Sequence, residues 1–325
     1  MTHMKIAILG AGWIAQKMAK AIAITPKAEA YAVASRNLEK AQEFANDFGF
    51  EKAYGSYEEL ANDPQVDLIY IATPHSHHYA HTRLVLEHGK HALVEKAFCA
   101  HLWQAKELVE LAEKKGLLLA EAMWTRYMPS RQYIRSIITS GTIGKVQAIS
   151  GNVGYPMSTK ERLFKPELAG GALLDVGIYP LTFSIMCMEE KIRRISSHAT
   201  LTTTKVDASE SITLEFENGA LATLHSTMMA ATDRNGNIFG DKGRIFVQNI
   251  NNPEKVVALD NDNHILSEKT FPQTEGENYE YELISAINHA EKGESECKEM
   301  PHAETLRMME LMENLLKEWG VEHNC

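Results

Sequence analysis

The chain has 325 residues, enough for about two domains of ordinary size. Hydrophobic residues make up 44% of it and charged residues 23%, which is typical of a soluble globular protein and rules out wholesale disorder. With 43 acidic against 33 basic residues the net charge is −10, so no global positive field is available to attract phosphate backbones. Nucleic acid is therefore not an expected partner.

The cysteine content points to a reducing compartment. Four cysteines are scattered without a CxxC pair, so neither a disulfide framework nor a structural zinc site is predicted. They are Cys99, Cys187, Cys297 and Cys325. The nearly uncharged stretch 170–188 is about as long as a membrane span, but Asp175 and Pro180 lie inside it, and a mid-bilayer Asp costs about 2.5–3.5 kcal/mol. We expect a cytoplasmic protein with no membrane partner.

Short apolar runs alternate with amphipathic helical patterns over the first 120 or so residues. The predicted strands are 5–9, 30–34, 68–72, 92–95 and 117–120. The predicted helices are 38–48, 77–88 and 102–115, each followed by a glycine. Asn37 and Gly49 are the expected N-cap and stop of the first of them. Such alternation is typical of a parallel sheet built from βαβ units, so we predict an α/β domain over residues 1–122.

The pattern changes after about residue 123. A helix is predicted from Pro129 to near Gly141, and later helices at 276–292 and 302–319. The predicted strands are 145–153, 192–204, 211–217, 220–228 and 244–248, with turns at 217–219 and 241–243. We expect residues 123–325 to form an α+β domain with a large, open, continuous antiparallel sheet. Its face is the expected contact of a homodimer or higher homo-oligomer.

The first predicted strand runs directly into the sequence Gly10-Ala11-Gly12-Trp13-Ile14-Ala15. This is the G-x-G-x-x-A form of the dinucleotide fingerprint, in a strand–turn–helix context. Gly10 allows the tight turn, Gly12 removes a Cβ from the path of a pyrophosphate, and the following helix directs N–H groups at that anion. A doubly wound, Rossmann-type dinucleotide-binding domain is therefore predicted.

The end of the second strand bears on which nicotinamide cofactor binds. Glu29 lies about 20 residues beyond the glycines, but at the start of the strand, roughly 15–20 Å from the ligand edge. Ser35 and Arg36 stand at the correct end and would complement a 2′-phosphate. We predict that NADP(H) is preferred over NAD(H); the alternative is that Arg36 is only a solvated charge.

Two further strands end in polar residues. Ligands of open α/β sheets bind beyond the carboxyl ends of the strands. The third apolar run ends in Thr73 and Pro74, and the fourth ends in Glu95 and Lys96. Lys96 is thus expected at the mouth of a nicotinamide pocket, although a solvent-exposed lysine at a strand end is the common alternative.

Six segments together resemble the Gfo/Idh/MocA oxidoreductase family across both predicted domains. They are GAGWIA at 10–15, ASR at 34–36, ATPHSHHY at 72–79, EKA at 95–97, EAMWTRYMP at 121–129 and GGALLDVGIYP at 170–180. The last two are most similar to the branch of dihydrodiol dehydrogenases and NADP-dependent D-xylose dehydrogenases. This resemblance implies an NAD(P)-dependent dehydrogenase acting on CH–OH groups.

The resemblance also implies roles for individual residues. The catalytic lysine of the family matches Lys96, its acid and proton-transfer residue match Asp175 and Tyr179, and its histidine after the Thr-Pro turn falls on His78. This chain has Ala97 where the family usually has proline after Glu-Lys. Asp175 and Tyr179 are also four residues apart, so a helix would place both on one face, about 6 Å apart. A helix-capping role for Asp175 and a core position for Tyr179 are the structural alternatives.

The expected reaction is hydride transfer between the nicotinamide and a carbinol carbon, coupled to proton transfer through Tyr179. Free tyrosine has a pKa of about 10, and a lysine ammonium within about 4–6 Å would lower it toward pH 8. Lys96 would also polarise the carbonyl, and Asp175 would orient the pair. The substrate is expected to be a sugar, a polyol or a cyclic diol. The side chains expected to contact it are Trp124, Arg126, Tyr127 and Tyr155; the alternative is that each of them serves only in packing.

Two other possibilities remain at this stage. His77 and His81 have the spacing of helical metal ligands, but no acidic residue or thiolate joins them locally, so no metal is predicted. The fold could also belong to a regulator that binds NADP without catalysis. Retention of Lys96, Asp175 and Tyr179 together argues against that alternative.

Overall fold

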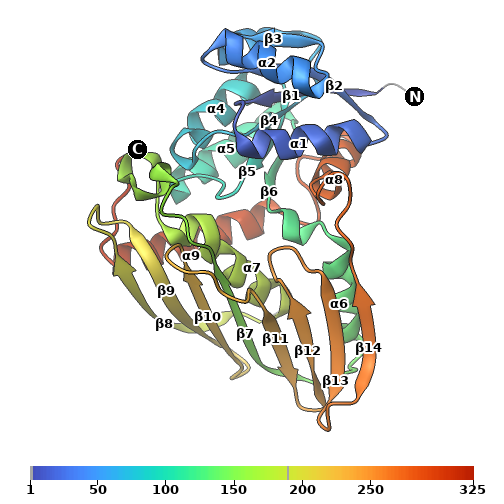
Figure 1. The fold of residues 1–325 in the computed structure, drawn as a ribbon, viewed down its shortest axis with the longest axis vertical. Helices are drawn as coiled ribbons and strands as arrows, with labels where there is room; N and C mark the ends of the chain where they lie inside the picture. The colour runs from blue at the N-terminus through green and yellow to red at the C-terminus, as the bar shows by residue number, and fades with distance from the viewer. Residues whose placement is uncertain (1–2, 189) are drawn as a thin grey trace. The chain divides into compact units, whose positions relative to one another are not determined.

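The computed structural model describes residues 3–188 and 190–325, and the chain divides into two compact units (Figure 1). The first contains the chain through Tyr127 together with Gln273–Glu310. The second contains Met128–Pro272 and Leu311–Cys325.

A six-stranded parallel sheet forms the centre of the first unit (Figure 1). Its strands are β1 (Met4–Leu9), β2 (Ala28–Ala34), β3 (Lys52–Tyr54), β4 (Leu68–Ile71), β5 (His91–Glu95) and β6 (Leu119–Ala122). Their order is β3-β2-β1-β4-β5-β6, and every pair is parallel. This is the doubly wound order of dinucleotide-binding domains, as predicted.

Helices connect these strands, as the sequence pattern indicates. They are α1 (Trp13–Ile24), α2 (Leu38–Phe48), α3 (Tyr57–Asn62), α4 (His75–Glu87), α5 (Leu102–Lys115) and the short η1 (Trp124–Arg126). The boundaries predicted for α2 are confirmed, because the Asn37 side chain accepts a hydrogen bond from the Lys40 amide at 3.0 Å and Gly49 adopts a φ of 73°. β3 and α3 were not predicted, because segments of 3 and 6 residues carry too few apolar positions to show a period.

Residues 273–310 pack with the first unit, whereas the sequence-based division placed them in the second domain. α8 (Glu280–Glu291) contacts α1 and β5. The Leu119 amide on β6 also donates to the Ser295 carbonyl at 2.9 Å. These contacts join residues more than 150 positions apart in the sequence, so no local sequence pattern predicts them.

The second unit is built on an eight-stranded sheet in the order β14-β13-β12-β11-β7-β10-β9-β8 (Figure 1). Its strands are β7 (Val146–Gly154), β8 (Ile192–Leu201), β9 (Asp207–Phe216), β10 (Leu221–Thr227), β11 (Gly236–Gly240), β12 (Gly243–Gln248), β13 (Lys255–Asp260) and β14 (Ile265–Thr270). The prediction of a continuous antiparallel sheet is wrong at one pair, because β10 runs parallel to β7. After β7 the chain passes through helices and the β8–β9 hairpin before β10 inserts beside β7.

The apolar stretch of the sequence is a core helix of the second unit. The segment comprises η3 (Pro166–Leu168), the π-helical turn η4 (Leu173–Gly177) and α7 (Ile178–Cys187), and follows η2 (Glu161–Phe164). It is long and apolar enough to span a membrane, but 89% of its most apolar window is buried inside the protein, where α7 packs on β7 and β10. α6 (Pro129–Thr139) and α9 (His302–Glu318) complete the fold. Within the described residues, no disulfide joins the four cysteines.

Candidate active site

The carboxyl ends of four strands of the first unit form one edge of the parallel sheet. Leu9 pairs with both Ala34 and Ile71, and Ile71 pairs with Val94, so β1, β2, β4 and β5 end in register. The residues that follow these ends are Gly10, Ser35, Thr73 and Lys96. Lys5 pairs with Glu29 at the other end of the sheet, so Glu29 is excluded from this edge.

The glycine-rich turn has the geometry that a dinucleotide requires. Gly10 adopts a φ of 107°, and a Cβ there would lie 2.9 Å from the Ala72 carbonyl oxygen. At Gly12 a Cβ would meet no heavy atom within 4 Å, so this position opens onto free space. No side chain caps α1, which begins at Trp13, and Ala15 is fully buried against the sheet. These residues therefore fit a dinucleotide pyrophosphate at the start of α1.

Arg36 lies beside aromatic and imidazole side chains that follow other strands. Burial raises the pKa of Tyr57, and a hydrogen bond from Arg36 opposes that rise. Burial also lowers the pKa of His77 and His81, the latter to about 4, and the charge of Arg36 adds to both effects. The rings of Tyr57 and His81 meet edge-on with centroids 4.6 Å apart. The sequence indicated Arg36, but not Tyr57, since α3 was not predicted.

His78 is fully buried and connects the ends of β4 and β5. Its Nε2 lies 2.7 Å from the Thr73 carbonyl oxygen, and its Nδ1 lies 2.9 Å from that of Ala97. The Lys96–Ala97 peptide bond is cis. Pro74 is the N-cap of α4, the helix that carries His78. His78 thus holds in place the backbone next to Lys96.

Glu95 and Lys96 differ in accessibility. Glu95 is buried and accepts hydrogen bonds from the Tyr70 hydroxyl and, at 3.2 Å, from the Lys96 amide. Burial and the Glu95 charge raise the pKa of Tyr70 well above its usual value, so Tyr70 is a neutral donor. Lys96 is half-buried.

The segment after β6 combines one aromatic platform with two packing residues. Trp124 stacks on Tyr279 with ring centroids 4.5 Å apart and planes inclined by 18°. Arg126 is 5% exposed and donates from Nε to the Glu299 carbonyl at 2.8 Å. The Tyr127 hydroxyl, also buried, donates to the Glu121 carbonyl at 2.8 Å. These contacts account for Arg126 and Tyr127 as packing residues of the first unit.

In the second unit, Asp175 and Tyr179 lie on the buried helical segment. Asp175, in η4, is 5% exposed, and its Oδ1 accepts a hydrogen bond from Arg162 at 2.8 Å. No sequence pattern identified Arg162 as the partner of this acid. Tyr179, in the first turn of α7, is half-buried, whereas every other residue between Ala169 and Ile185 is buried. Tyr179 is therefore partly accessible within a run of buried residues, 169–185.

Tyr155 follows β7 and is held by polar side chains. Its hydroxyl accepts hydrogen bonds from Arg234 at 2.8 Å and from the Asn251 amide at 3.2 Å. The Arg234 guanidinium also lies 5.0 Å from the ring centroid. These contacts fix the orientation of the aromatic ring.

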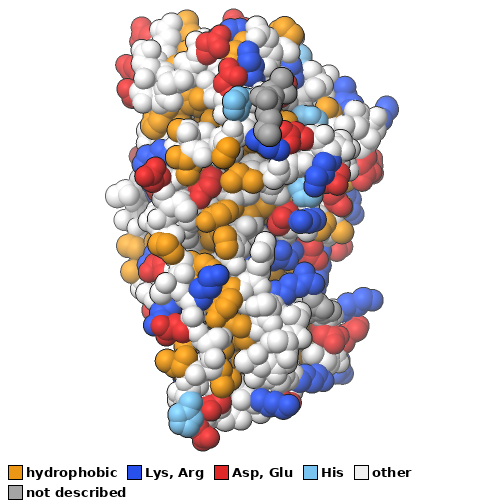
Figure 2. All heavy atoms as spheres, turned by 90° about the vertical axis from the view of Figure 1, so that its right-hand side faces the viewer, with side chains coloured by type: hydrophobic (Ala, Val, Ile, Leu, Met, Phe, Trp, Pro, Cys, Tyr) orange, Lys and Arg blue, Asp and Glu red, His pale blue; other side chains and the backbone are white. Residues whose placement is uncertain are grey.

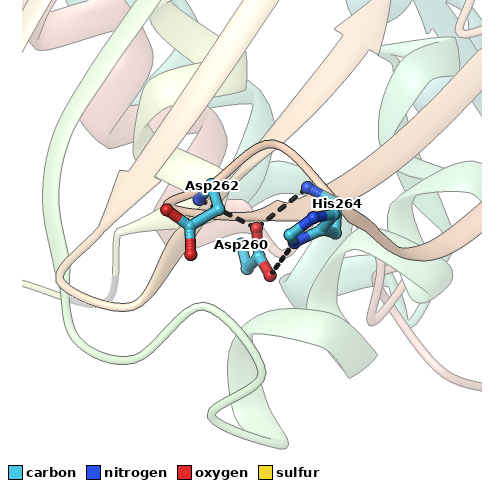
Figure 3. Close-up of side chains that lie close together, drawn as sticks. All are labelled: Asp260, Asp262 and His264. Atoms are coloured by element: carbon cyan, nitrogen blue, oxygen red, sulfur yellow. Dashed lines mark hydrogen bonds and ion pairs between the residues drawn. The ribbon is translucent and has the colours of Figure 1, made fainter.

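Within the described residues, the acidic and imidazole groups that come close enough to hold a metal ion are Asp260, Asp262 and His264 (Figure 3). They lie at the β13–β14 turn. Asp260 Oδ1 accepts from the amides of Asp262 and His264 at 2.9 Å each, and its Oδ2 lies 3.1 Å from His264 Nδ1. Because these bonds close the turn, we assign the group to hairpin stability. His81, which was considered and rejected as a metal ligand, has its Nδ1 3.0 Å from the Thr73 hydroxyl.

Comparison with known proteins identifies the family. Residues 4–123 match the model described as the oxidoreductase family with an NAD-binding Rossmann fold, and residues 131–246 match the GFO/IDH/MocA C-terminal domain. The chain belongs to the Gfo/Idh/MocA oxidoreductase family. This is a family of oxidoreductases with an NAD-binding Rossmann fold, and curated relatives are named as dehydrogenases, which argues against a non-enzymatic regulator.

Two curated relatives cover nearly the whole chain. The trans-1,2-dihydrobenzene-1,2-diol dehydrogenase of Xenopus laevis is 34% identical over 98% of each chain. The D-xylose 1-dehydrogenase (NADP(+)) of Hypocrea jecorina is 33% identical over 98% of this chain and 93% of its own. Among solved structures, KijD10, a 3-ketoreductase from Actinomadura kijaniata with NADP and TDP-benzene, has a TM-score of 0.87 at 23% identity over 96% of each chain. Levoglucosan dehydrogenase with NADH and L-sorbose has a TM-score of 0.88 at 18% identity over 98% of this chain and 97% of its own. The solved structures support the fold alone.

Proposed function

We propose that this chain is an NADP(H)-dependent dehydrogenase of sugars, polyols or cyclic diols, in which Tyr179 and Lys96 manage the substrate proton. The observation that carries the proposal is the partial accessibility of Tyr179 within residues 169–185, which are otherwise buried. The buried Asp175, paired with Arg162 in the preceding turn, supports the same assignment. If Tyr179 had no chemical role, a buried apolar residue like its neighbours would be expected at this position.

Each residue has a proposed task. When bound, a nicotinamide cofactor supplies or accepts the hydride. The Tyr179 phenol gives a proton to the substrate oxygen in reduction and takes it in oxidation. The Lys96 ammonium polarises that oxygen and favours the phenolate. Asp175, held by Arg162, orients the proton-transfer group.

Removal of the phenol or the ammonium tests this assignment. Tyr179→Phe and Lys96→Met should each lower kcat by at least about 100-fold, the usual minimum for a lost acid–base group, while the Kd for NADPH stays within twofold. Tyr133→Phe, which removes a phenol from α6, is the matched control and should keep wild-type activity. Near-normal turnover in either active-site variant would refute the assignment.

The preference for NADP(H) rests on Ser35 and Arg36 at the end of β2. One relative is named as NADP(+)-dependent and one solved neighbour binds NADP, whereas another binds NADH. Arg36→Ala should weaken NADPH binding by about 10–100-fold, the equivalent of one lost charge-assisted hydrogen bond, and leave NADH binding unchanged. Equal affinity of the wild-type protein for NADPH and NADH would contradict the preference.

The substrate class follows from the relatives and from two aromatic side chains. Both curated relatives are named for a cyclic diol or a sugar substrate. The stacked Trp124 and the anchored Tyr155 offer ring faces suited to either. A panel of pentoses, hexoses, polyols and trans-dihydrodiols, followed by reduced-nicotinamide absorbance, tests the class. No turnover on any of them would reject it.

We further propose that the protein acts in the cytoplasm as a homodimer that uses the large sheet. Hydrophobic side chains are exposed on the face in Figure 2, and the edge strand β14 leaves Ile265 62% and Leu266 46% exposed. Exposed apolar residues on a sheet favour association. Light scattering coupled to size exclusion should give twice the chain mass; a monomer at micromolar concentration would contradict the proposal.

A further inference from the structure

Two buried carboxyl groups lie directly beneath the helical segment that carries Asp175 and Tyr179. Asp207 opens β9 and is fully buried, and Glu210, three residues later on the same strand, is 1% exposed. Neither has a place in the mechanism proposed above. A buried carboxyl group costs stability unless something compensates for it, so its contacts need an explanation.

Asp207 caps the segment from across the fold. Its Oδ2 accepts a hydrogen bond from the Leu173 amide at 2.5 Å, and the Ala172 amide also donates to this carboxylate. Gly171 precedes these amides with a φ of 117°, and a Cβ there would lie 2.2 Å from Asp207 Oδ1. No residue adjacent in sequence provides a side-chain cap for this helical segment. The Asp207 carboxylate therefore acts as the N-cap of this segment, although Asp207 is 34 residues from Leu173 in the sequence.

Glu210 contacts the other end of the same turn. Its Oε1 accepts a hydrogen bond from the Ser226 hydroxyl on β10. A Cβ on Gly177 would lie 2.3 Å from that oxygen, so the backbone passes directly over the carboxyl group. The two carboxyl groups thus contact both ends of the π-helical turn η4, a type of turn frequent at functional sites.

Burial affects the ionisation of the two carboxyl groups to different extents. Burial raises the pKa of Asp207 to about 6, against the lowering effect of its backbone hydrogen bonds. Burial raises the pKa of Glu210 well above its usual range, and the charge of Asp207 adds to the rise. Asp207 is therefore ionised at pH 7.5, where a helix N-terminus favours negative charge, and the raised pKa of Glu210 favours its protonated form. Asp207 Oδ1 and Glu210 Oε2 have no hydrogen-bond partner among the described residues, which leaves room for this proton.

We propose that Asp207 is a positioning residue for proton transfer: its carboxylate, with Glu210 beside it, fixes the helical turn from which Asp175 and Tyr179 project. This inference rests on the proposed function of Tyr179. It assigns no contact with substrate to either carboxyl group. The two glycines of the motif, at 171 and 177, are required because they let these carboxyl groups reach the backbone.

Activity provides the first test. In Asp207→Asn, which keeps the acceptor but not the charge, kcat at pH 8 should fall about tenfold, with the substrate KM and the NADPH Kd within twofold of wild type. Asp207→Ala, which loses both, should fall at least another tenfold, so that Asn partly rescues. Glu215→Gln, which removes a half-exposed carboxylate from the same strand, is the matched control and should be unchanged. Wild-type kcat in both Asp207 variants would overturn the proposal.

The pH profile separates positioning from a purely structural role. Wild-type kcat should decline as the pH falls through about 6, and this decline should vanish in Asp207→Asn because nothing is left to protonate. The titratable or charged groups on the surrounding elements are Asp175, Arg162, Glu210, His225 and His323. His225→Gln and His323→Gln should keep the decline. A decline that persists in Asp207→Asn would overturn the proposal.

Hydrogen–deuterium exchange tests the cap without any assay of activity. Peptides that cover residues 170–179 should exchange at least tenfold faster in Asp207→Ala than in wild type, while peptides of β12 and β13 should not change. Unchanged exchange in 170–179 would overturn the inference, whatever the kinetics. If the wild-type protein turns over no substrate of the panel yet shows this pattern, the proposed function fails and the capping contact stands.

Discussion

Replacement of both buried carboxyl groups, as Asp207→Asn with Glu210→Gln, should remove a pH dependence of stability. The double variant is chosen because Glu210 would begin to titrate at lower pH once the charge of Asp207 were gone. Both substitutions keep the size of the side chain and an acceptor oxygen for the amide and hydroxyl donors. Only the ionisation is removed.

The magnitude follows from the displaced pKa of Asp207. Its value is about 6 in the folded protein against 3.8 ordinarily, and each pKa unit is worth about 1.36 kcal/mol, so ionisation costs the fold about 3 kcal/mol. Since the folded state binds this proton more tightly than the unfolded chain, the stabilising contribution is complete below pH 4. It is lost as the pH rises through about 6. The double variant should therefore gain at least about 3 kcal/mol relative to wild type between pH 4 and pH 7.5, because loss of the raised pKa of Glu210 adds to the gain in the same direction.

Urea unfolding at several pH values between 4 and 7.5 measures this difference, read on the transition of the second unit because two compact units can unfold in separate steps. Glu215→Gln should run parallel to wild type over the whole range. If the double variant also runs parallel, within about 0.5 kcal/mol, the pair carries no displaced ionisation and the reasoning is refuted.

Three further variants test other buried features. Burial alone would raise the pKa of Asp63, but hydrogen bonds, that from Tyr54 foremost, hold it well below its usual range. Asp63→Asn should cost about 3 kcal/mol at pH 7 by urea unfolding, and this loss should begin to shrink as the pH falls below about 4 and vanish only as the pH falls through the lowered pKa of the folded protein. Gly171→Ala should lower stability by at least about 3 kcal/mol in thermal unfolding, against about 1 kcal/mol for Gly49→Ala, where a Cβ meets nothing within 4 Å. Burial raises the pKa of Glu121 to about 7, so Glu121→Gln should be more stable than wild type by about 3 kcal/mol at pH 8.5 and lose that advantage below pH 4.5; equal melting temperatures at both pH values would contradict this.

Signals that lie within a few residues of one another could be interpreted from the sequence. The glycine turn at Gly10 and Gly12 lies between a strand and a helix, as its spacing predicts. α2 begins after Asn37 and ends before Gly49, because capping needs only a side chain three residues away and a residue that tolerates positive φ. The position of Lys96 could also be predicted locally, because it directly follows the apolar residues of a buried strand.

Partners far apart in sequence were determined by the tertiary structure. Arg162 pairs with Asp175, and Asp207 caps the turn that contains it, although many arginines and carboxylates were available in the sequence. β10 inserts parallel to β7, and α8 packs with the first unit, because burial of apolar surface, and not local propensity, chooses between pairings.

The amino-acid sequence alone determined the doubly wound domain, its glycine-rich turn, and the residue types of the candidate active site. These depend on periodicity and on turns, which neighbouring residues set. The tertiary structure decided how the segment with Asp175 and Tyr179 is held, because its cap comes from Asp207 on a strand of the sheet. A carboxylate can replace a local cap only where folding buries it against the open amides, and no sequence period records that contact.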